Sequence, residues 1–510
     1  MRLALGALAI STGFAGADEW PTTWGPEIER LPNAPAAQAA TDQETSPVQL
    51  TTPLIRVAFA PDALAPRQDV TDASDDVMNA DDSTNELSDD EEPSGPPAAA
   101  EVEEEDEDEE EEKPKKWYDR IGFRGYAQFR LNEVVDVAPD SAPPQHAGDS
   151  SIGRNQNFLI RRARIIFSGD VSDHVYVYLQ PDFASNLPGS PDANQYVQIR
   201  DWYGDIYLDA CKVNRFRVGQ SKVPYGWEDL QSSSNRVPLD RNDAFNSGVR
   251  NERDLGVFYY WTPVYAQELY KYVLDENLKG SGNYGVLGLG VYNGQGGSLQ
   301  EQNENVHVVG RFEVPFQTHS GQIFEVGVQA YTGKYVVLGS PIRPLGLGVE
   351  DETPLNTFST GGRAGLRDER LGASFIMYPQ PIGFQAEWTI GRGPMLNDAQ
   401  TEIVVDDLEG GYAMVLAKIE TECYGPLFPF ARWSYYDGGY KSARNAPDSY
   451  IDEWEIGCEW QFNPAAEFTV SYLITDRTNL SAISSSAPAS SESYEQFIGD
   501  VLRLQLQINY

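Results

Sequence analysis

The last ten residues, Val501 to Tyr510, read VLRLQLQINY, and this stretch decides the fold. Apolar side chains stand at Leu502, Leu504, Leu506, Ile508 and Tyr510, and polar side chains stand at Arg503, Gln505, Gln507 and Asn509. A period of two predicts a β-strand with one apolar and one polar face. A strand of this kind that ends on an aromatic ring is typical of an outer-membrane β-barrel, whose strands face lipid and lumen alternately between aromatic girdles.

The same alternation continues upstream through most of the chain. In Ile451 to Phe462, Trp454 and Ile456 share a face opposite Glu453 and Glu455, so charge lies at the middle of the strand. A wet lumen accommodates such charges better than a solid core does. Alternating segments begin near residues 121, 158, 174, 197, 214, 254, 284, 304, 322, 369, 382, 409, 427, 451, 466 and 500. We therefore expect an all-β fold, a transmembrane antiparallel β-barrel of about 16 strands.

Composition excludes two other classes. No stretch of the 510 residues approaches the run of roughly 18 to 20 apolar residues that a transmembrane helix needs, which excludes a helical membrane protein. Three cysteines are too few for a disulfide framework. Aromatic residues make up 11% of the chain, which favours a β-rich protein with interfacial rings.

The N-terminal region divides into an export signal and an acidic segment. Arg2 precedes a short apolar run that ends on a small-residue cleavage site, so residues 1–17 are predicted to be a signal peptide. Residues 18–116 are rich in proline, alanine, serine and acids, and we expect this segment to stay disordered in the periplasm. Residues 1–116 hold 29 acidic and 7 basic side chains, which leaves −18 of the total charge of −40 for the barrel domain, residues 117–510.

Eleven of the twelve residues from Glu101 to Glu112 are carboxylates, and two interpretations of this run stay open. One is a solvated, self-repelling tether, and the other is a binder of divalent cations or of a basic partner. The tether is favoured because no spacing in the run resembles a calcium-binding loop with its glycine. The basic patch from Lys113 to Lys116 adjoins Trp117 and Tyr118, which predicts an anchor at the membrane edge.

Most connections obey the alternation of short turns and long loops that such barrels show. Short turns are expected at Pro379 to Pro381 and at Asn463 to Ala465. The link from Pro263 to Asn283 should be a turn but is long, and its sequence predicts a short helix from Ala266 to Leu274. We interpret this insertion as a helical plug or a periplasmic contact.

Arginines are concentrated in the first part of the barrel segment. Phe158 to Gly169 reads FLIRRARIIFSG and carries three arginines in an otherwise apolar strand. An arginine that faces lipid costs roughly 2 to 4 kcal/mol at the bilayer midplane. Arg162 and Arg164 share a face, so we expect them to point into the lumen, whereas Arg161 is expected near a rim or a subunit contact.

Four motifs carry a family resemblance, namely RRAR at 161–164, VYVYLQPDF at 175–183, RVGQSKVPYGWEDLQSS at 217–233 and NERDLGV at 251–257. In this order they resemble the phosphate-selective porins, the phosphate and pyrophosphate porins of Gram-negative outer membranes. The resemblance is good over residues 120–260 and lies at the level of pattern from there to Tyr510. It implies a homotrimer of sixteen-stranded barrels in which the loop after Trp227 folds inward and narrows an arginine-lined pore.

The resemblance and the lumenal faces together select the candidate pore and anion-binding residues. These are Arg161, Arg162, Arg164, Asp201, Arg217, Lys222, Arg236, Arg241, Arg250 and Arg343. Arg161 and Arg162 match the family's arginine pair beside the constriction, and Asp201 lies where the family has an acidic strand. Phosphate-binding members carry lysines in the inward loop, whereas this chain has Glu228 to Ser234, so only weak phosphate binding is expected. Arg503, near the final loop, is expected to lie apart from these residues.

The sequence favours an outer-membrane porin of a Gram-negative-type bacterium that passes small anions, with phosphate and polyphosphate as candidate solutes. The lumenal arginines could instead form salt bridges with carboxylates such as Glu453 and Asp205, and both interpretations stay open. A protein of another class, which is anchored by the barrel and uses the acidic segment as an envelope spacer that binds cations or a cell-wall partner, is the alternative.

The expected partners are small anionic solutes and outer-membrane lipid, with no nucleic acid. We expect no enzymatic activity, no cofactor and no metal. The reason is that the four histidines lack metal-ligand spacing, and no nucleophile-elbow, phosphate-loop or zinc motif is present.

Limited proteolysis tests the expected organisation of the chain. We predict that a protease removes residues 18–116 from the detergent-solubilised protein and leaves the barrel folded, because this segment has no apolar pattern with which to order itself. Heat-modifiable migration on a gel and the far-ultraviolet spectrum report the fold after cleavage. Protection of the segment in the intact protein would contradict the prediction.

Overall fold

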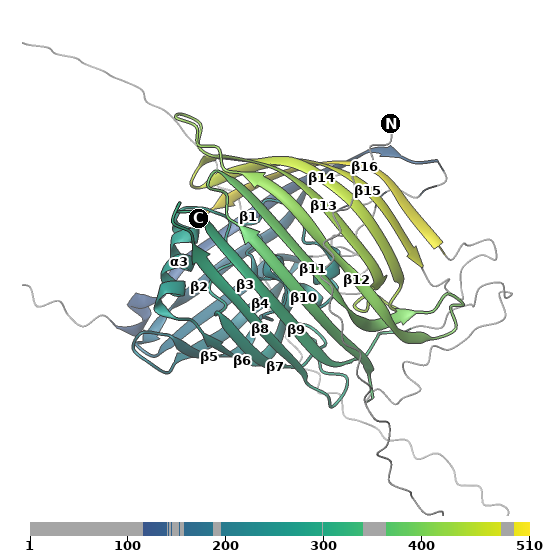
Figure 1. The fold of residues 1–510 in the computed structure, drawn as a ribbon, viewed down its shortest axis with the longest axis horizontal. Coiled ribbons are helices and arrows are strands. Elements are labelled where there is room, and N and C mark those ends of the chain that lie inside the picture. Colours follow the sequence, from purple (N-terminus) through teal and green to yellow (C-terminus); the bar gives the residue numbers. More distant parts are fainter. Residues whose placement is uncertain are drawn as a thin grey trace, which may run out of the picture. The chain divides into compact units, whose positions relative to one another are not determined.

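The computed structural model describes residues 116–139, 141, 144, 152, 158–186, 195–297, 299–339, 364–480 and 494–510. Within them, sixteen antiparallel strands form a closed barrel in which sequence neighbours pair and β16 returns to β1 (Figure 1). The strands are β1 (Gly122–Val137), β2 (Leu159–Ser172), β3 (Val175–Asn186), β4 (Gln195–Tyr207), β5 (Asn214–Lys222), β6 (Arg253–Trp261), β7 (Leu287–Tyr292), β8 (His307–Gln317), β9 (Ile323–Tyr335), β10 (Leu366–Met377), β11 (Ile382–Leu396), β12 (Ile403–Ala417), β13 (Leu427–Gly439), β14 (Asp448–Asn463), β15 (Ala466–Leu480) and β16 (Tyr494–Asn509). The helices are η1 (Trp117–Arg120), α1 (Trp227–Leu230), α2 (Asp243–Asn246), η2 (Arg250–Glu252) and α3 (Val264–Asp275). The expected all-β barrel of about 16 strands is confirmed.

The predicted signal peptide, the acidic segment up to residue 115 and Arg343 lie outside the described residues. Fourteen strands begin within three residues of the predicted starts, whereas β12 and β16 begin at Ile403 and Tyr494 instead of near 409 and 500. Asp406 and Asp407 interrupt the apolar alternation of β12, yet the ladder continues through them. A barrel strand can extend beyond the apolar band, where its outer face no longer needs apolar side chains.

The polarity of the two faces of the barrel wall is the reverse of that in a soluble protein, with polar side chains inside and apolar side chains outside. On β14, Glu455 is 1% exposed, while its neighbour Trp454 is 51% exposed. On β16, Arg503 is buried and Ile508 points outward, as the alternation predicts. Apolar side chains therefore cover the outer surface, and polar side chains fill the interior.

Aromatic rings on the outer face form two connected groups. Phe316, Phe324, Phe375 and Phe384 touch in sequence beside the short turns, with ring centroids 5.5 to 6.1 Å apart. Trp388, Trp433, Tyr435 and Tyr450 form a second group nearer the long loops, with centroids 5.7 to 6.2 Å apart. Such rings suit the interfaces between lipid and water.

The last residue closes the barrel. Tyr510 donates its backbone N–H to the carbonyl oxygen of Gly125 (3.0 Å) and accepts from the Gly125 N–H (2.6 Å). A Cβ atom at Gly125 would clash with the carbonyl oxygen of Arg164 and with the ring of Tyr510. Glycine is therefore required where the final aromatic ring packs against β1.

One turn on the short-turn side departs from the simple pattern. The connection between β6 and β7, residues 262–286, contains α3, which lies at the same end of the barrel as the C-terminus (Figure 1). The helix predicted from Ala266 to Leu274 is thus confirmed, with bounds of Val264–Asp275. No helix in the described part of the chain has both the length and the hydropathy needed to cross a membrane.

Arginine substitutions at two outward valines on neighbouring strands test which surface faces lipid. Val328 lies near the middle of β9 and Val308 near the loop end of β8, and both are exposed. We predict that Val328→Arg lowers the free energy of unfolding in lipid vesicles by about 2 to 4 kcal/mol, and Val308→Arg by about 0 to 1 kcal/mol. Denaturant titration of the vesicle-embedded barrels measures both, and equal costs would contradict this assignment.

Candidate pore constriction

The loop between β5 and β6, residues 223–252 and here called L3, folds into the lumen, where its helices α1 and α2 are buried. Glu387 on β11 accepts hydrogen bonds from the backbone N–H groups of Trp227 (2.6 Å) and Glu228 (2.8 Å). Trp227 also donates from Nε1 to Glu325 on β9 (2.9 Å). The two bonds to Glu387 satisfy the first two backbone N–H groups of α1, which have no partner within the helix.

Arginines of the β10–β15 wall hold one side of L3. Arg432 on β13 pairs with Glu228 (2.9 Å), and Arg477 on β15 pairs with Asp243 (2.7 Å). Arg370 on β10 donates to a carbonyl oxygen of α2 (2.8 Å). These two acids of the loop therefore lie against a wall that supplies their counter-charges.

The middle of L3 contacts the wall formed by β1 and β2. The Ser233 carbonyl oxygen accepts from Gln128 (2.9 Å), and the Ser233 hydroxyl lies 2.8 Å from Tyr126 and 3.0 Å from Arg164. Val237 packs on the other side, among apolar side chains of β12 and β13. L3 thus crosses the whole lumen and narrows it.

Arginines gather where L3 meets β1, β2 and β16. The group here called the basic cluster consists of Arg130, Arg161, Arg162, Arg236 and Arg503. Asp240 of L3 lies among them, 3.3 Å from Arg130 and 3.9 Å from Arg161. Arg503 on β16 also pairs with Asp240. Three guanidinium groups from three strands therefore share one carboxylate of the loop.

Two members of the basic cluster pair with no carboxylate among the described residues. Arg162 donates to the side-chain oxygen of Gln128 (2.7 Å), and Arg236 donates to two carbonyl oxygens of L3 (2.8 Å each). Nε of Arg162 and Nη1 of Arg236 have no hydrogen-bond partner in the part of the chain that the structure describes. Burial, together with repulsion from Arg241, lowers the pKa of Arg236 to about 9, so the guanidinium stays protonated at neutral pH.

A cavity of about 140 Å³ lies beside the basic cluster, between L3, strands β2 to β6 and the β6–β7 connection. Its lining consists of Arg164, Tyr178, Gln180, Asp201, Tyr203, Lys222, Leu230, Ser232, Ser233, Arg253, Ser281 and Tyr284. Arg164 pairs with Asp182 (2.8 Å), and Arg253 pairs with Asp201 (2.9 Å). Lys222 instead donates to two carbonyl oxygens of L3 (2.8 Å each). These two bonds hold the Lys222 side chain between β5 and L3, at the wall of the cavity.

Other predicted pore residues lie in ion pairs or away from the cavity. Arg217 makes two hydrogen bonds to Asp205 on β4 (2.7 and 2.8 Å). Arg241 pairs with Glu252 (2.7 Å). Arg250 lies in η2 and packs against the loop between β7 and β8. Salt bridging, the competing interpretation of the arginines, therefore describes Arg217 and Arg241.

Strand register corrects two expectations. A β-bulge opposite Gln128 shifts the register at Arg161, so its guanidinium turns toward Asp240 inside the barrel, whereas a place near a rim or a subunit contact was expected. Arg503, expected to lie apart near the final loop, sits on β16 beside β1 and belongs to the basic cluster. Sequence reasoning also missed Arg130, although its alternation with apolar neighbours placed it on the lumenal face.

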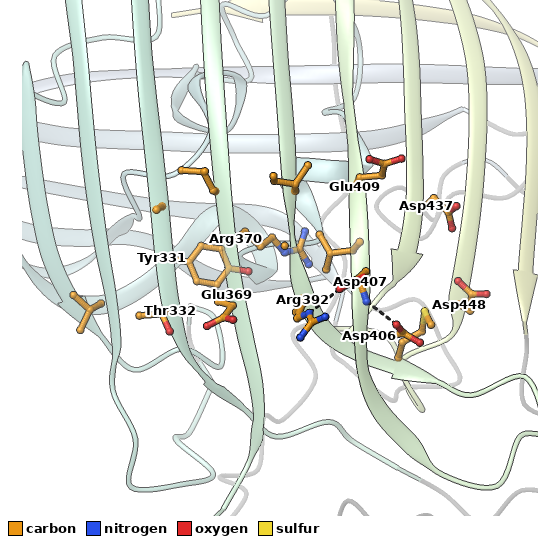
Figure 2. Close-up of a pocket in the computed structure, with 17 residues that line it drawn as sticks. Tyr331, Thr332, Glu369, Arg370, Arg392, Asp406, Asp407, Glu409, Asp437 and Asp448 are labelled. Atoms are coloured by element: carbon orange, nitrogen blue, oxygen red, sulfur yellow. Dashed lines mark hydrogen bonds and ion pairs between the residues drawn. The ribbon is translucent and has the colours of Figure 1, made fainter. Parts of the chain in front are cut away.

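A larger recess of about 1030 Å³ lies away from the lumen, over the wall from β8 to β14 (Figure 2). Its outward side chains include exposed apolar residues of β10 and β11 and the ion pair between Arg392 and Asp407 (2.7 Å). Glu369, Glu409 and Asp437 add further carboxylates. This recess is acidic and faces outward, so it does not lie on the path of a solute through the barrel.

A closed sixteen-stranded barrel with an apolar outer surface and a loop folded into its lumen defines an outer-membrane porin. The chain belongs to the family described as phosphate-selective porin O and P, whose sequence profile matches residues 144–510. Membership of this family places the protein in the outer membrane as a channel rather than an enzyme. No curated protein matches the chain.

Solved structures of outer-membrane proteins are among those to which the chain is similar. OmpT of Vibrio cholerae in its in-vitro folded form has a TM-score of 0.45 and 9% identity, with 76% of this chain and 97% of that chain covered. The outer membrane channel DcaP of Acinetobacter baumannii has a TM-score of 0.42 and 12% identity, with 76% and 97% covered. The anion-selective porin from Comamonas acidovorans has a TM-score of 0.41 and 10% identity, with 76% and 99% covered.

The pH dependence of stability tests the state of Asp229 in α1. Burial raises the pKa of this carboxyl well above its usual value, against the opposing effect of Arg241 at 3.6 Å. Between about pH 4 and the raised pKa, the unfolded chain binds fewer protons at this position than the native state does, so stability falls as pH rises. We predict that Asp229→Asn removes this loss and gains thermal stability over the unmodified protein between about pH 4 and about pH 7.

Asp173→Asn is the matched control, because Asp173 lies in the β2–β3 turn and its side chain is 94% exposed. Thermal unfolding of both variants across this pH range measures the difference. An Asp229→Asn variant that follows the pH profile of the control would show that Asp229 is ionised in the native state.

Proposed function

We propose that the protein passes small anions across the outer membrane through a constriction formed by L3, the basic cluster and Lys222. The observation that carries this proposal is that Arg162 and Arg236 are buried and lack a carboxylate partner among the described residues. A buried guanidinium that lacks a counter-charge is costly, and a passing anion supplies what is missing. The site therefore favours negative solutes.

The negative charge of the barrel segment does not oppose this selectivity. Lumenal acids such as Asp205, Asp243 and Glu455 are held in short ion pairs with arginines. Charges more than about 8 Å away are largely screened at physiological salt, whereas a narrow site walled by protein focuses the field of the charges next to it. The basic cluster and Lys222 therefore set the sign of the preference.

Phosphate is a candidate solute, in line with the description of the family. The planar guanidinium of arginine donates two parallel hydrogen bonds to a phosphate and stays charged. L3 nevertheless contains no lysine, and its Glu228 pairs with Arg432. We therefore infer several weak anion sites rather than one tight site, which suits conduction. Family membership also supports a homotrimer, and we include that assembly in the proposal.

Reversal potentials of the purified protein in planar bilayers test the proposal. In a gradient of potassium chloride we predict an anion preference, and Arg162→Ala combined with Arg236→Ala should lower the anion-to-cation permeability ratio about threefold or more, since the uncompensated charge is removed. Phosphate added to chloride should block the current only weakly, with half-block at about 1 mM or above.

Arg392→Ala is the matched control, because Arg392 lies on the outer face in an exposed pair with Asp407. This variant should keep the permeability ratio of the unmodified protein. A cation preference in the unmodified protein would overturn the proposal, as would a ratio that the loss of Arg162 and Arg236 leaves unchanged.

A further inference from the structure

The β6–β7 connection sends a segment across the lumen from the end opposite to L3. This segment, residues 276–283, follows α3 and is here called the strap. Short turns of such barrels face the periplasm, so the strap enters the lumen from the periplasmic side. The strands that carry it, β6 and β7, lie eight and seven places from β14 in the closed order of sixteen. To reach β14, the strap must therefore cross the width of the barrel.

The strap is fastened to that opposite wall. Nζ of Lys279 lies 2.5 Å from Oε1 of Glu459 on β14, and both side chains are almost completely buried. The same ammonium lies 4.4 Å from the ring centroid of Phe428 on β13. Asn277 donates to the side-chain oxygen of Gln461 on β14 (2.5 Å). A buried ion pair of this geometry fixes one position of the segment against the wall.

The strap also contacts L3 through hydrogen bonds and an apolar cluster. Gln231 and Asn235 of L3 donate to the carbonyl oxygens of Lys279 (2.6 Å) and Gly280 (2.8 Å). Leu278 is buried in the same apolar cluster as Trp227. The two segments enter from opposite ends of the barrel and meet in the middle, so the position of each one depends on the other.

The strap contributes to the wall of the cavity beside the basic cluster. Ser281 lines that cavity together with Arg164, Lys222 and Tyr284. The Ser281 hydroxyl is buried and has no hydrogen-bond partner within the described residues. Asn277 and Lys279 adopt left-handed backbone conformations, with φ of 51° and 63°. Such conformations are costly for residues other than glycine, and they persist where the surroundings hold them.

We propose that the strap is a second pore-narrowing element, which closes the β13–β14 side of the lumen and confines solutes to the cavity along β2 to β6. The ion pair between Lys279 and Glu459 is its latch. This inference rests on the proposed function only in that the confined path is lined by Lys222 and lies beside the basic cluster. Release of the latch widens the pore on the side where Arg432 and Arg477 pair with carboxylates.

A charge-swap experiment tests the latch. Glu459→Lys places two ammonium groups together and expels the strap, so single-channel conductance in symmetrical potassium chloride should rise about twofold or more. The double variant Glu459→Lys with Lys279→Glu restores an ion pair and should return the conductance to that of the unmodified protein. Asp275→Lys is the matched control, because it breaks the exposed pair with Lys271 on α3 of the same connection. Its conductance should not change.

A folded Glu459→Lys variant with unmodified conductance would overturn the proposal, as would a conductance that the swap does not restore. If Glu459→Lys does not fold, Ser281→Cys in a background without the three native cysteines gives the answer. A negatively charged thiol reagent should then reduce the current, whereas the same reagent on Ser320→Cys, in the exposed β8–β9 turn, should not. An unchanged current after modification at residue 281 would overturn the proposal. Conductance does not depend on the sign of selectivity, so a cation-preferring pore with a working latch would refute the proposed function alone.

Discussion

The narrow lumen depends on one carboxylate, that of Glu387, which accepts hydrogen bonds from two successive N–H groups of L3. Tyr412 adds a third hydrogen bond to the same carboxylate (3.1 Å). Trp227 and Glu228 are almost completely buried, so their backbone N–H groups need such partners. From this fixed point L3 brings Ser233 to one side of the lumen and Asp243 to the other. The cavity and the basic cluster exist only because the loop is held there.

L3 also separates the lumen into two electrostatic environments. On the side of β10 to β15, acids of the loop and the wall meet arginines at short distances, as in the contacts of Arg432 with Glu228 and Glu455 (2.9 Å each). On the side of β1, β2 and β16, guanidinium groups outnumber the carboxylate that L3 supplies, and within the described ranges Arg162 donates only to the side-chain oxygen of Gln128. Net charge sums over both sides and over the outer surface. It therefore describes solubility and long-range attraction rather than the sign of the field in the constriction.

The sequence predicted the barrel well because a period of two is a local signal that lipid and lumen impose on every strand. It placed Arg162 and Arg164 on the lumenal face for the same reason. The helix-like sequence from Ala266 to Leu274, a second local signal, predicted α3 in the β6–β7 connection. Its errors arise where a non-local contact or a change of register intervenes. The bulge beside Arg161 inverts the direction of one side chain, and a pattern based on alternation cannot show it. Arg503 was expected to lie apart from the pore arginines because the contact between L3 and β16 is a tertiary contact, which the sequence does not show.

The strap depends on non-local contacts that the sequence did not predict. The need to fix its position accounts for the polar nature of these contacts. An ion pair such as that of Lys279 with Glu459 contributes little net stability, because burial of both charges offsets their attraction. An apolar contact would stabilise the crossing as well but would tolerate sliding, whereas an ammonium in contact with one carboxylate accepts a single position. The left-handed residues at 277 and 279 add cost to the crossing, and each such residue costs about 1 to 3 kcal/mol. A segment that bears this cost and is held by a buried ion pair gains a fixed position rather than stability. A wall of a conducting path needs a fixed position.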